Sequence, residues 1–347
     1  MILNFCTLFN ISYLDRGLAM YYSLKDNCDN FHLYIYAFDD ETLNFFYANN
    51  FPSVTVISLL EFEDNELLEI KPTRSAGEYC WTCTPATIYF CIQKYNLPNC
   101  TYIDADLFFF SNPKVLIDEM GNNSVLITEH RYTDKYDQSV ESGIYCVQFV
   151  TFKNDEFGLK VLKWWRDACI EWCFARAEDG KFGDQKYLDN WPTNFEKVHV
   201  LENLGGGVAP WNVQQFSINL KRSKLIIKEK LTGHSTPLVF YHFHGLRFYK
   251  NQVVSLTSNY YEIESSVKKY LYTKYVSSIL SISYQHKNSI PFAKANGASE
   301  DFVGTVITRQ YLAKRYLFDL RKSISNIFGK SLANFLKNYH YYNIHDF

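Results

Sequence analysis

Short apolar runs alternate with longer amphipathic stretches through the first hundred residues, and this alternation is the strongest constraint on the fold. The runs expected to be strands are Ile2–Phe9, Phe31–Phe38, Val54–Ser58 and Thr101–Ile103, and the stretches expected to be helices are Leu14–Leu24 and Tyr79–Tyr95. Strands that alternate with helices build a mostly parallel sheet covered on both faces. We therefore predict a Rossmann-like α/β domain over residues 1–253 and a helical, basic extension over residues 254–347.

Two aspartates follow the last of these strands, in the sequence Tyr102-Ile103-Asp104-Ala105-Asp106. Ligands of open α/β sheets bind at the carboxyl ends of the strands. In an extended backbone, residues i and i+2 point the same way, so both carboxylates can reach one ion. Hard divalent cations such as Mn²⁺ or Mg²⁺ accept carboxylate oxygens. The pair predicts a metal site, although Asp-x-Asp is also common in solvated turns.

A histidine-rich segment, Tyr241-His242-Phe243-His244-Gly245, ends the last apolar run of the same half. Imidazole is a good ligand for Mn²⁺, so either His242 or His244 could complete the metal site. The alternative is a hydrogen-bonded core histidine. Gly245 suggests a loop whose backbone comes close to a phosphate, and the nearby cations are Arg247 and Lys250, which could contact a diphosphate.

Two further segments combine polar residues with special backbone requirements. Asp184 and Gln185 could accept hydrogen bonds from sugar hydroxyl groups and stabilise positive charge at a reacting carbon. The alternative for Asp184 is that it caps a helix. In Gly205-Gly206-Gly207, followed by Trp211, the amides of Gly206 and Gly207 could cradle a phosphate and the indole could stack on a sugar. The alternative for the glycine run is a tight connection.

Taken in order, these motifs resemble those of GT-A-fold glycosyltransferases of family 8, the glycogenin and lipopolysaccharide galactosyltransferase type, over residues 1–250. The resemblance implies that a sugar is moved from a nucleoside-diphosphate sugar, by the same resemblance a UDP-sugar, with retention of configuration. It implies Mn²⁺ (or Mg²⁺) at Asp104, Asp106 and His242, and catalytic roles for Asp184 and Gln185. Donor-binding residues implied by the same resemblance are Thr7, Leu8, Phe9, Asn10, Tyr13, Ala105, Ser142 and Gly143.

Two positions depart from that family's pattern. Phe248 stands where the family often has a lysine after its His-x-x-Gly motif, and the helix before the aspartate pair carries no arginine, although Arg74 lies upstream. A separate, related family is therefore the alternative assignment.

The basic C-terminal segment Thr308–Asn338 has the spacing of an amphipathic helix with lysine and arginine on its polar face. Such a helix can lie on an anionic membrane surface, where a lipid-linked glycan acceptor would be within reach. A helix docked on the catalytic domain is the alternative.

The net charge of −2 gives no reason to expect a nucleic-acid partner. An odd number of cysteines, nine, and an amino terminus that looks like a strand favour the cytoplasm, with Cys80 and Cys83 as free structural thiols. The basic C-terminal segment adds the inner face of the membrane as an alternative location.

Three other functions compete with sugar transfer. A sugar-1-phosphate nucleotidyltransferase would need a basic, glycine-rich loop after the first strand, and a phosphohydrolase would carry its aspartate pair at the first strand. Neither pattern is present. The third alternative is a catalytically degenerate protein that binds a nucleotide sugar or glycan with the same fold.

Overall fold

The computed structural model describes residues 2–258, 260–300 and 340–347. The strands are β1 (Leu3–Phe9), β2 (Phe31–Ala37), β3 (Val54–Ser58), β4 (Asn99–Ile103), β5 (Leu107–Phe109), β6 (Val125–Glu129), β7 (Tyr145–Lys153), β8 (Val198–Val200), β9 (Phe216–Lys221), β10 (Lys224–Glu229), β11 (Ser235–Pro237), β12 (Phe240–His242), β13 (Arg247–Tyr249), β14 (Val253–Ser255) and β15 (Tyr341–Asn343). The α-helices are α1 (Leu14–Asn27), α2 (Asp40–Ala48), α3 (Leu59–Phe62), α4 (Asn65–Ile70), α5 (Ala76–Lys94), α6 (Lys114–Glu119), α7 (Ser139–Ser142), α8 (Glu156–Glu171), α9 (Trp191–Asn194), α10 (Ser265–Val267), α11 (Thr273–His286) and α12 (Phe292–Ala295).

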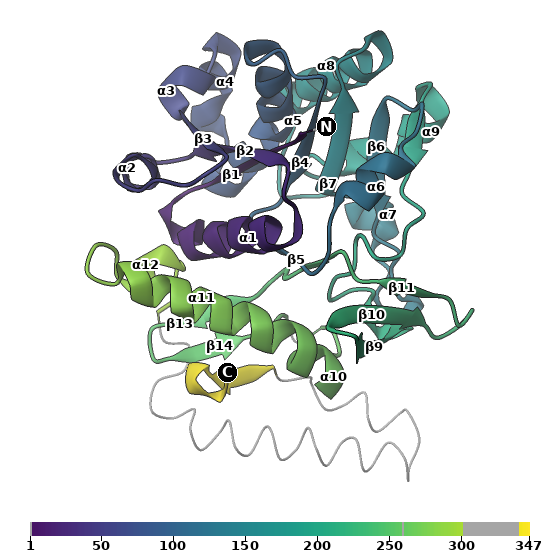
Figure 1. Cartoon of the computed structure of the whole chain (residues 1–347). Coiled ribbons are helices and arrows are strands. Elements are labelled where there is room, and N and C mark those ends of the chain that lie inside the picture. The colour runs from purple at the N-terminus through teal and green to yellow at the C-terminus, as the bar shows by residue number, and fades with distance from the viewer. Residues whose placement is uncertain (1, 259, 301–339) are drawn as a thin grey trace.

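A seven-stranded sheet with the order β3-β2-β1-β4-β7-β6-β8 forms the centre of the molecule. Only β7 runs against the other strands, pairing antiparallel with both β4 and β6. Helices cover both faces, with α1 on one side of the sheet and α5 and α8 on the other (Figure 1). The predicted fold class, α/β with a mostly parallel central sheet, is confirmed.

Local signals in the sequence explain where the long helices begin. Asp39 accepts a hydrogen bond from the Thr42 amide at 2.7 Å and caps α2. Ser75 and Glu78 form a reciprocal capping box at the start of α5. Pro85 lies inside α5 and does not end it, because that stretch of the helix is buried against the sheet.

The region after residue 253 packs into the core of the main domain. Figure 1 shows α11 alongside α1, and Tyr275, Val276 and Ile279 of α11 belong to the same buried cluster as Leu14 and Leu18 of α1. Residues 254–300 therefore extend an existing hydrophobic core. The domain boundary at residue 253 stays a prediction.

A buried hydrogen-bonded group fastens these two helices to each other. The Asp15 carboxylate, which is fully buried, contacts Nε2 of His286 at 2.6 Å and accepts a hydrogen bond from Nδ2 of Asn296 at 2.5 Å. A buried carboxylate is costly unless it is paired and hydrogen-bonded, and both conditions are met here.

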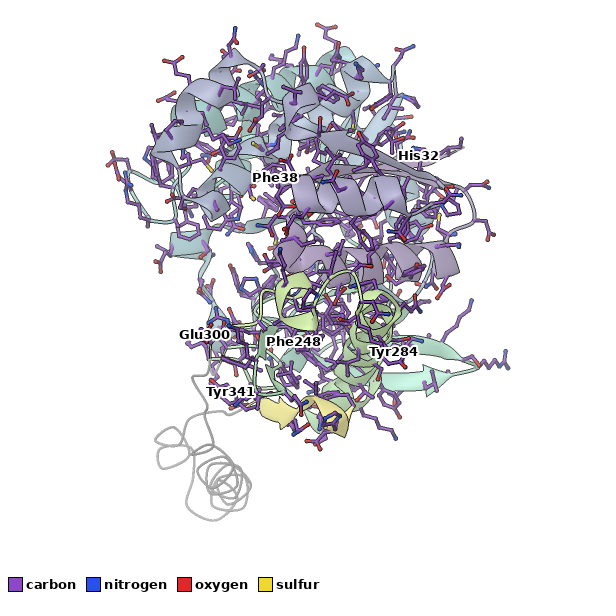
Figure 2. All side chains as sticks on the ribbon, turned by 90° about the vertical axis from the view of Figure 1, so that its left-hand side faces the viewer. His32, Phe38, Phe248, Tyr284, Glu300 and Tyr341 are labelled. Atoms are coloured by element: carbon purple, nitrogen blue, oxygen red, sulfur yellow. The ribbon has the colours of Figure 1, made fainter. Side chains whose placement is uncertain are left out.

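The structure also contains small antiparallel sheets, which include several strands that the sequence analysis did not predict. They are β9-β10-β11, β5 with β12, and β13-β14-β15. The ring of Phe248 in β13 packs against Phe292 of α12 at 5.2 Å between centroids, in the lower half of the view in Figure 2. The predicted basic helix Thr308–Asn338 lies outside the described residues. Within the described part of the chain, no helix is long and apolar enough to cross a bilayer.

Candidate functional site

The two aspartates lie in the turn that joins β4 to β5. Asp104 follows the last residue of β4, and its carbonyl accepts a hydrogen bond from the Leu107 amide at 3.2 Å. The sequence analysis attributed the shared direction of the two carboxylates to an extended backbone. That reason was wrong, because the pair is brought together by a tight turn.

His242 reaches the same point from a distant part of the sequence. It ends β12, which pairs antiparallel with β5 in a register that sets His242 opposite Leu107, directly after Asp106. Its Nε2 lies 3.1 Å from Oδ1 of Asp106 and 3.7 Å from Oδ2 of Asp104. Three oxygen and nitrogen ligands from two segments therefore converge on one small volume.

The orientation of the His242 ring is fixed from behind. Its Nδ1 lies 2.9 Å from Oε1 of Gln148, a buried residue of β7. Because an amide oxygen only accepts, Nδ1 carries the proton and Nε2 faces the aspartates. The indole of Trp211 closes one side, 5.4 Å between ring centroids, and donates its own N–H to the carbonyl of His130.

Asp104, Asp106 and His242 shift one another's pKa values. Removal from water raises the pKa of Asp104 to about 6, with the negative charge of Asp106 acting in the same direction. Removal from water opposes ionisation of Asp106 too, but the charge and hydrogen bond of His242 hold its pKa at about 2. Burial alone would lower the pKa of His242, yet Asp106 raises it well above its usual value. The group is thus organised around negative charge that attracts a cation.

The donor set fits a hard divalent cation. One ligand atom from each of Asp104, Asp106 and His242 lies within 4.8 Å of the others. Carboxylate oxygens and one imidazole are ligands that Mn²⁺ and related ions accept. His244 is not part of this compact group; its ring centroid lies 5.6 Å from that of His242, against the indole of Trp211. Of the two predicted histidines, His242 is therefore the better candidate.

A cavity of about 680 Å³ opens beside this group. It extends from the end of β1 past the aspartate turn to the first turns of α5 and the segment that follows α8. Residues predicted for the site that line it are Leu8, Phe9, Asn10, Tyr13, Asp104, Ala105, Asp106, Ser142, Asp184, Gln185, Trp211, His242 and His244.

Asp184 and Gln185 form one wall of the cavity. Asp184 does not cap the following helix, which begins at Lys186 with Gln185 at the capping position. It is 5% exposed, and this burial, with the charge of Asp104, raises the pKa of its carboxyl to about 7. The Gln185 amide donates to the carbonyl of Ser142 at 2.6 Å, which links the wall to α7.

The glycine run does not line the cavity, contrary to the functional interpretation. Gly206 and Gly207 are buried, and a Cβ on either would lie within 2.9 Å of neighbouring side chains such as Leu116 or Thr128. Gly207 also has a φ of +85°. The run is therefore a tightly packed connection, in which the amides of Gly205 and Gly206 donate to Asn203.

Other predicted residues also lie off the cavity lining. Thr7 is buried inside β1, before the end of the strand that opens onto the cavity. Gly143 is a buried residue with a φ of +103° that ends α7. Gly245 and Arg247 are exposed and do not belong to the cavity lining.

Lys250 does not face the cavity either, and it is ion-paired. Its ammonium group contacts the carboxylate of Glu300, a residue at the edge of the lower half in Figure 2. The predicted diphosphate contacts through Arg247 and Lys250 are not supported by this arrangement.

Arg16 is an important residue that the sequence analysis missed. It is 4% exposed on α1, its guanidinium stands 4.5 Å from the Tyr13 ring centroid, and its charge helps to keep the pKa of Asp106 low. Arg74, noted from the sequence, instead donates to the carbonyl of Ile170 and stacks on Phe174. A buried arginine gives no periodic signal, so only the fold could reveal it.

Aromatic side chains supply much of the remaining wall. Those not predicted for the site are Trp81, Tyr102, Tyr132, Phe182 and Tyr261. In a chain with 18% aromatic residues, the sequence offers no means of separating these from core aromatics.

Comparison with known proteins gives two related sequences. The chain is 31% identical over 278 residues to the uncharacterized protein YfnD of Bacillus subtilis (strain 168), covering 79% of this chain and 87% of that protein. It is 29% identical over 253 residues to YfnF of the same organism, also uncharacterized, covering 70% of this chain and 81% of that protein. No protein-family model matches the chain.

Solved structures with partial likeness carry glycosyltransferase names. The galactosyltransferase LgtC, solved with donor and acceptor sugar analogues, has a TM-score of 0.49 and 11% identity, covering 80% of this chain and 96% of that chain. The glycosyltransferase GlyE of Streptococcus pneumoniae has a TM-score of 0.37 and 13% identity, covering 60% of this chain and 47% of that chain.

Proposed function

The chain belongs to the family of the Bacillus subtilis protein YfnD, and we propose that it is a metal-dependent glycosyltransferase that takes its sugar from a nucleoside-diphosphate sugar, a UDP-sugar by resemblance. The acceptor is a glycan or a lipid-linked glycan of a surface polysaccharide.

One observation carries this proposal. Asp104, Asp106 and His242 converge at the carboxyl end of β4, on a cavity whose other wall holds Asp184 and Gln185. The chain thus offers a cation site and a polar wall on one space large enough for a small ligand. A protein that only bound nucleotides would not need both the cation site and the polar wall.

A divalent cation held by Asp104, Asp106 and His242 would neutralise the diphosphate and so make it a better leaving group. The other roles belong to side chains of this chain. Leu8, Phe9 and Asn10 at the end of β1 would bind the base and ribose, with Tyr13 beside them, because this strand end opens onto the same cavity. Gln148 would keep the His242 ring in its metal-binding tautomer.

Asp184 and Gln185 would act on the sugar. An ionised Asp184 would accept hydrogen bonds from the sugar hydroxyl groups. It would also stabilise positive charge at the anomeric carbon as the bond from that carbon to the phosphate breaks. Gln185, held by the Ser142 carbonyl, would fix the position of that wall. We propose retention of configuration, as in the enzymes whose motifs the sequence resembles.

The test is turnover of a sugar nucleotide by the purified full-length chain. Release of the nucleoside diphosphate from one donor among UDP-, GDP-, CDP- and dTDP-sugars, dependent on added Mn²⁺ and abolished by chelation, supports the proposal. Metal-dependent binding of a donor without any release, with glycan acceptors present, would instead favour the degenerate binding protein.

A further inference from the structure

The cavity is acidic in an unusual way for a site that would bind a diphosphate. Its lining carries the carboxylates of Asp104, Asp106 and Asp184, and among the residues that the structure describes it includes no lysine or arginine. The basic groups of the lining are three imidazoles, of which His242 is committed to the aspartates.

Two strong cations close in sequence to lining residues, Arg16 and Lys186, are bound to protein groups. The guanidinium of Arg16 donates to the carbonyls of Ser12, Asn296 and Leu246 at 3.1–3.3 Å. Lys186, which directly follows Gln185, forms an ion pair with the carboxylate of Asp189 at 2.8 Å. These cations are therefore not available to a ligand without breaking existing contacts.

One stretch of the cavity wall carries no charged side chain. Gly77, Cys80 and Trp81, on the first turns of α5, face the cavity together with Phe182, whose ring centroid lies 6.4 Å from that of Trp81. Residues four apart on a helix share a face, so Gly77 and Trp81 form one continuous strip of this wall.

We propose that the sugar subsite is built for an uncharged sugar and excludes sugars that bear a carboxylate, such as uronic acids. This rests on the proposed function. A sugar carboxylate would lose its water against Trp81 and Phe182 and would meet Asp184, with no lysine or arginine in the described lining to compensate its charge. Unpaired like charges of this kind are a common means of rejecting a wrong ligand.

Position 77 allows the charge of this wall to be changed with little disturbance. A Cβ added at Gly77 would have no atom within 4 Å, and the backbone there is helical. Replacing a helical glycine favours the helix, which offsets the unfavourable placement of a cation near a helix N-terminus. Gly77→Arg therefore adds a guanidinium to the cavity, and Gly77→Gln is the matched uncharged variant.

The first experiment measures affinity with the full-length protein and Mn²⁺. Thermal shifts with UDP, CDP, GDP and dTDP identify the base, and titration then compares the glucose and glucuronic acid conjugates of that nucleoside diphosphate. We expect the glucuronic acid conjugate to bind at least tenfold more weakly. Equal or tighter binding of that conjugate overturns this inference and leaves the proposed function standing, whereas the failure of every nucleotide to bind overturns both.

The second experiment repeats the titration with the two Gly77 variants. Gly77→Arg is expected to reduce the preference for the glucose conjugate by at least tenfold, and Gly77→Gln to keep it. If Gly77→Arg keeps the parent's preference for the glucose conjugate, the charge of the cavity wall does not determine which sugar is bound. That result also overturns the inference.

Discussion

The amide oxygen of Gln148 accepts a hydrogen bond from Nδ1 of His242 at 2.9 Å, and this contact decides which ring nitrogen faces Asp104 and Asp106. Both residues are buried, so neither can exchange the bond for one with water. Support of a metal-binding histidine from its second nitrogen fixes the tautomer and the ring angle.

Gln148→Met is therefore expected to weaken Mn²⁺ binding by about 10–100-fold, since the residue keeps similar bulk but no longer accepts the Nδ1 proton. Titration of Mn²⁺ by electron paramagnetic resonance measures the change. Gln148→Glu, which retains an acceptor, should stay closer to the parent protein. Equal affinities for the parent and the methionine variant would contradict the assigned role of Gln148.

Asp106→Asn should abolish Mn²⁺-dependent donor binding and leave the fold intact. The carboxylate is the one closest to His242, and His242 holds its pKa at about 2, so it is ionised throughout the neutral range. A saturating donor at ~100 times its dissociation constant adds about 2.7 kcal/mol of stability, and this increment should vanish in the variant. Asp118→Asn, on the exposed end of α6, is the control. A variant that still shows the parent's metal-dependent stabilisation would rule out the proposed metal site.

Asp184→Asn should lower turnover much more than donor affinity. Asp184 lines the same cavity as the metal group, and a group that stabilises charge only in the transition state changes kcat rather than binding. We expect a loss of about 10²–10³ in kcat, the size seen when one such stabilising group is removed. Single-turnover release of nucleoside diphosphate measures it, with the exposed Asp167→Asn as control. A loss confined to affinity would indicate a binding role only.

His286 should make stability depend on pH. The hydrogen bond to Asp15 raises the pKa of His286 above its value of 6.5 in the unfolded chain. The imidazolium is thus favoured in the folded state, so its stabilising effect is complete below pH 6.5 and is lost as pH rises through the raised pKa. One pKa unit corresponds to about 1.4 kcal/mol.

The measurement is the melting temperature of the parent and of His286→Gln between pH 5.5 and 8.5. The gap between the two should be widest at the acidic end and should narrow by about 1–3 °C toward pH 8.5. Taking the difference removes the titration of other groups. A gap that is constant or widens with pH would contradict the assignment.

The sequence predicted the central sheet well because its signals are local. The run Val54–Ser58 was predicted with the bounds that β3 has, and the helix expected over Leu14–Leu24 is the first part of α1. The edge sheets were harder. Strands such as β13 and β14 have three residues each, which is too short for a periodic pattern.

The site was predictable where a motif carried it and not where the fold assembled it. Asp104, Asp106 and His242 were identified from residue type and order, but the turn that unites the aspartates was not. Gln148 and Arg16 were missed, because each acts through a partner that is distant in sequence. Residue type alone also led to a wrong interpretation of the glycine run, because glycines occur in tightly packed connections as well as in phosphate-binding loops.

Gly207→Ala distinguishes a tightly packed connection from a phosphate-binding loop. The φ of +85° and a Cβ that would lie 2.7 Å from Cγ2 of Thr128 predict a loss of stability of about 1–3 kcal/mol. The affinity of the folded fraction for a nucleotide donor should stay within twofold of the parent value, because Gly207 does not line the cavity. Gly77→Ala, in a helix with open space around the Cβ, is the control and should be neutral or stabilising by up to about 1 kcal/mol. Unfolding in denaturant measures the stability, and calorimetric titration below the melting temperature measures the affinity. A variant that keeps the parent's stability but loses affinity would restore the run as a phosphate-binding loop.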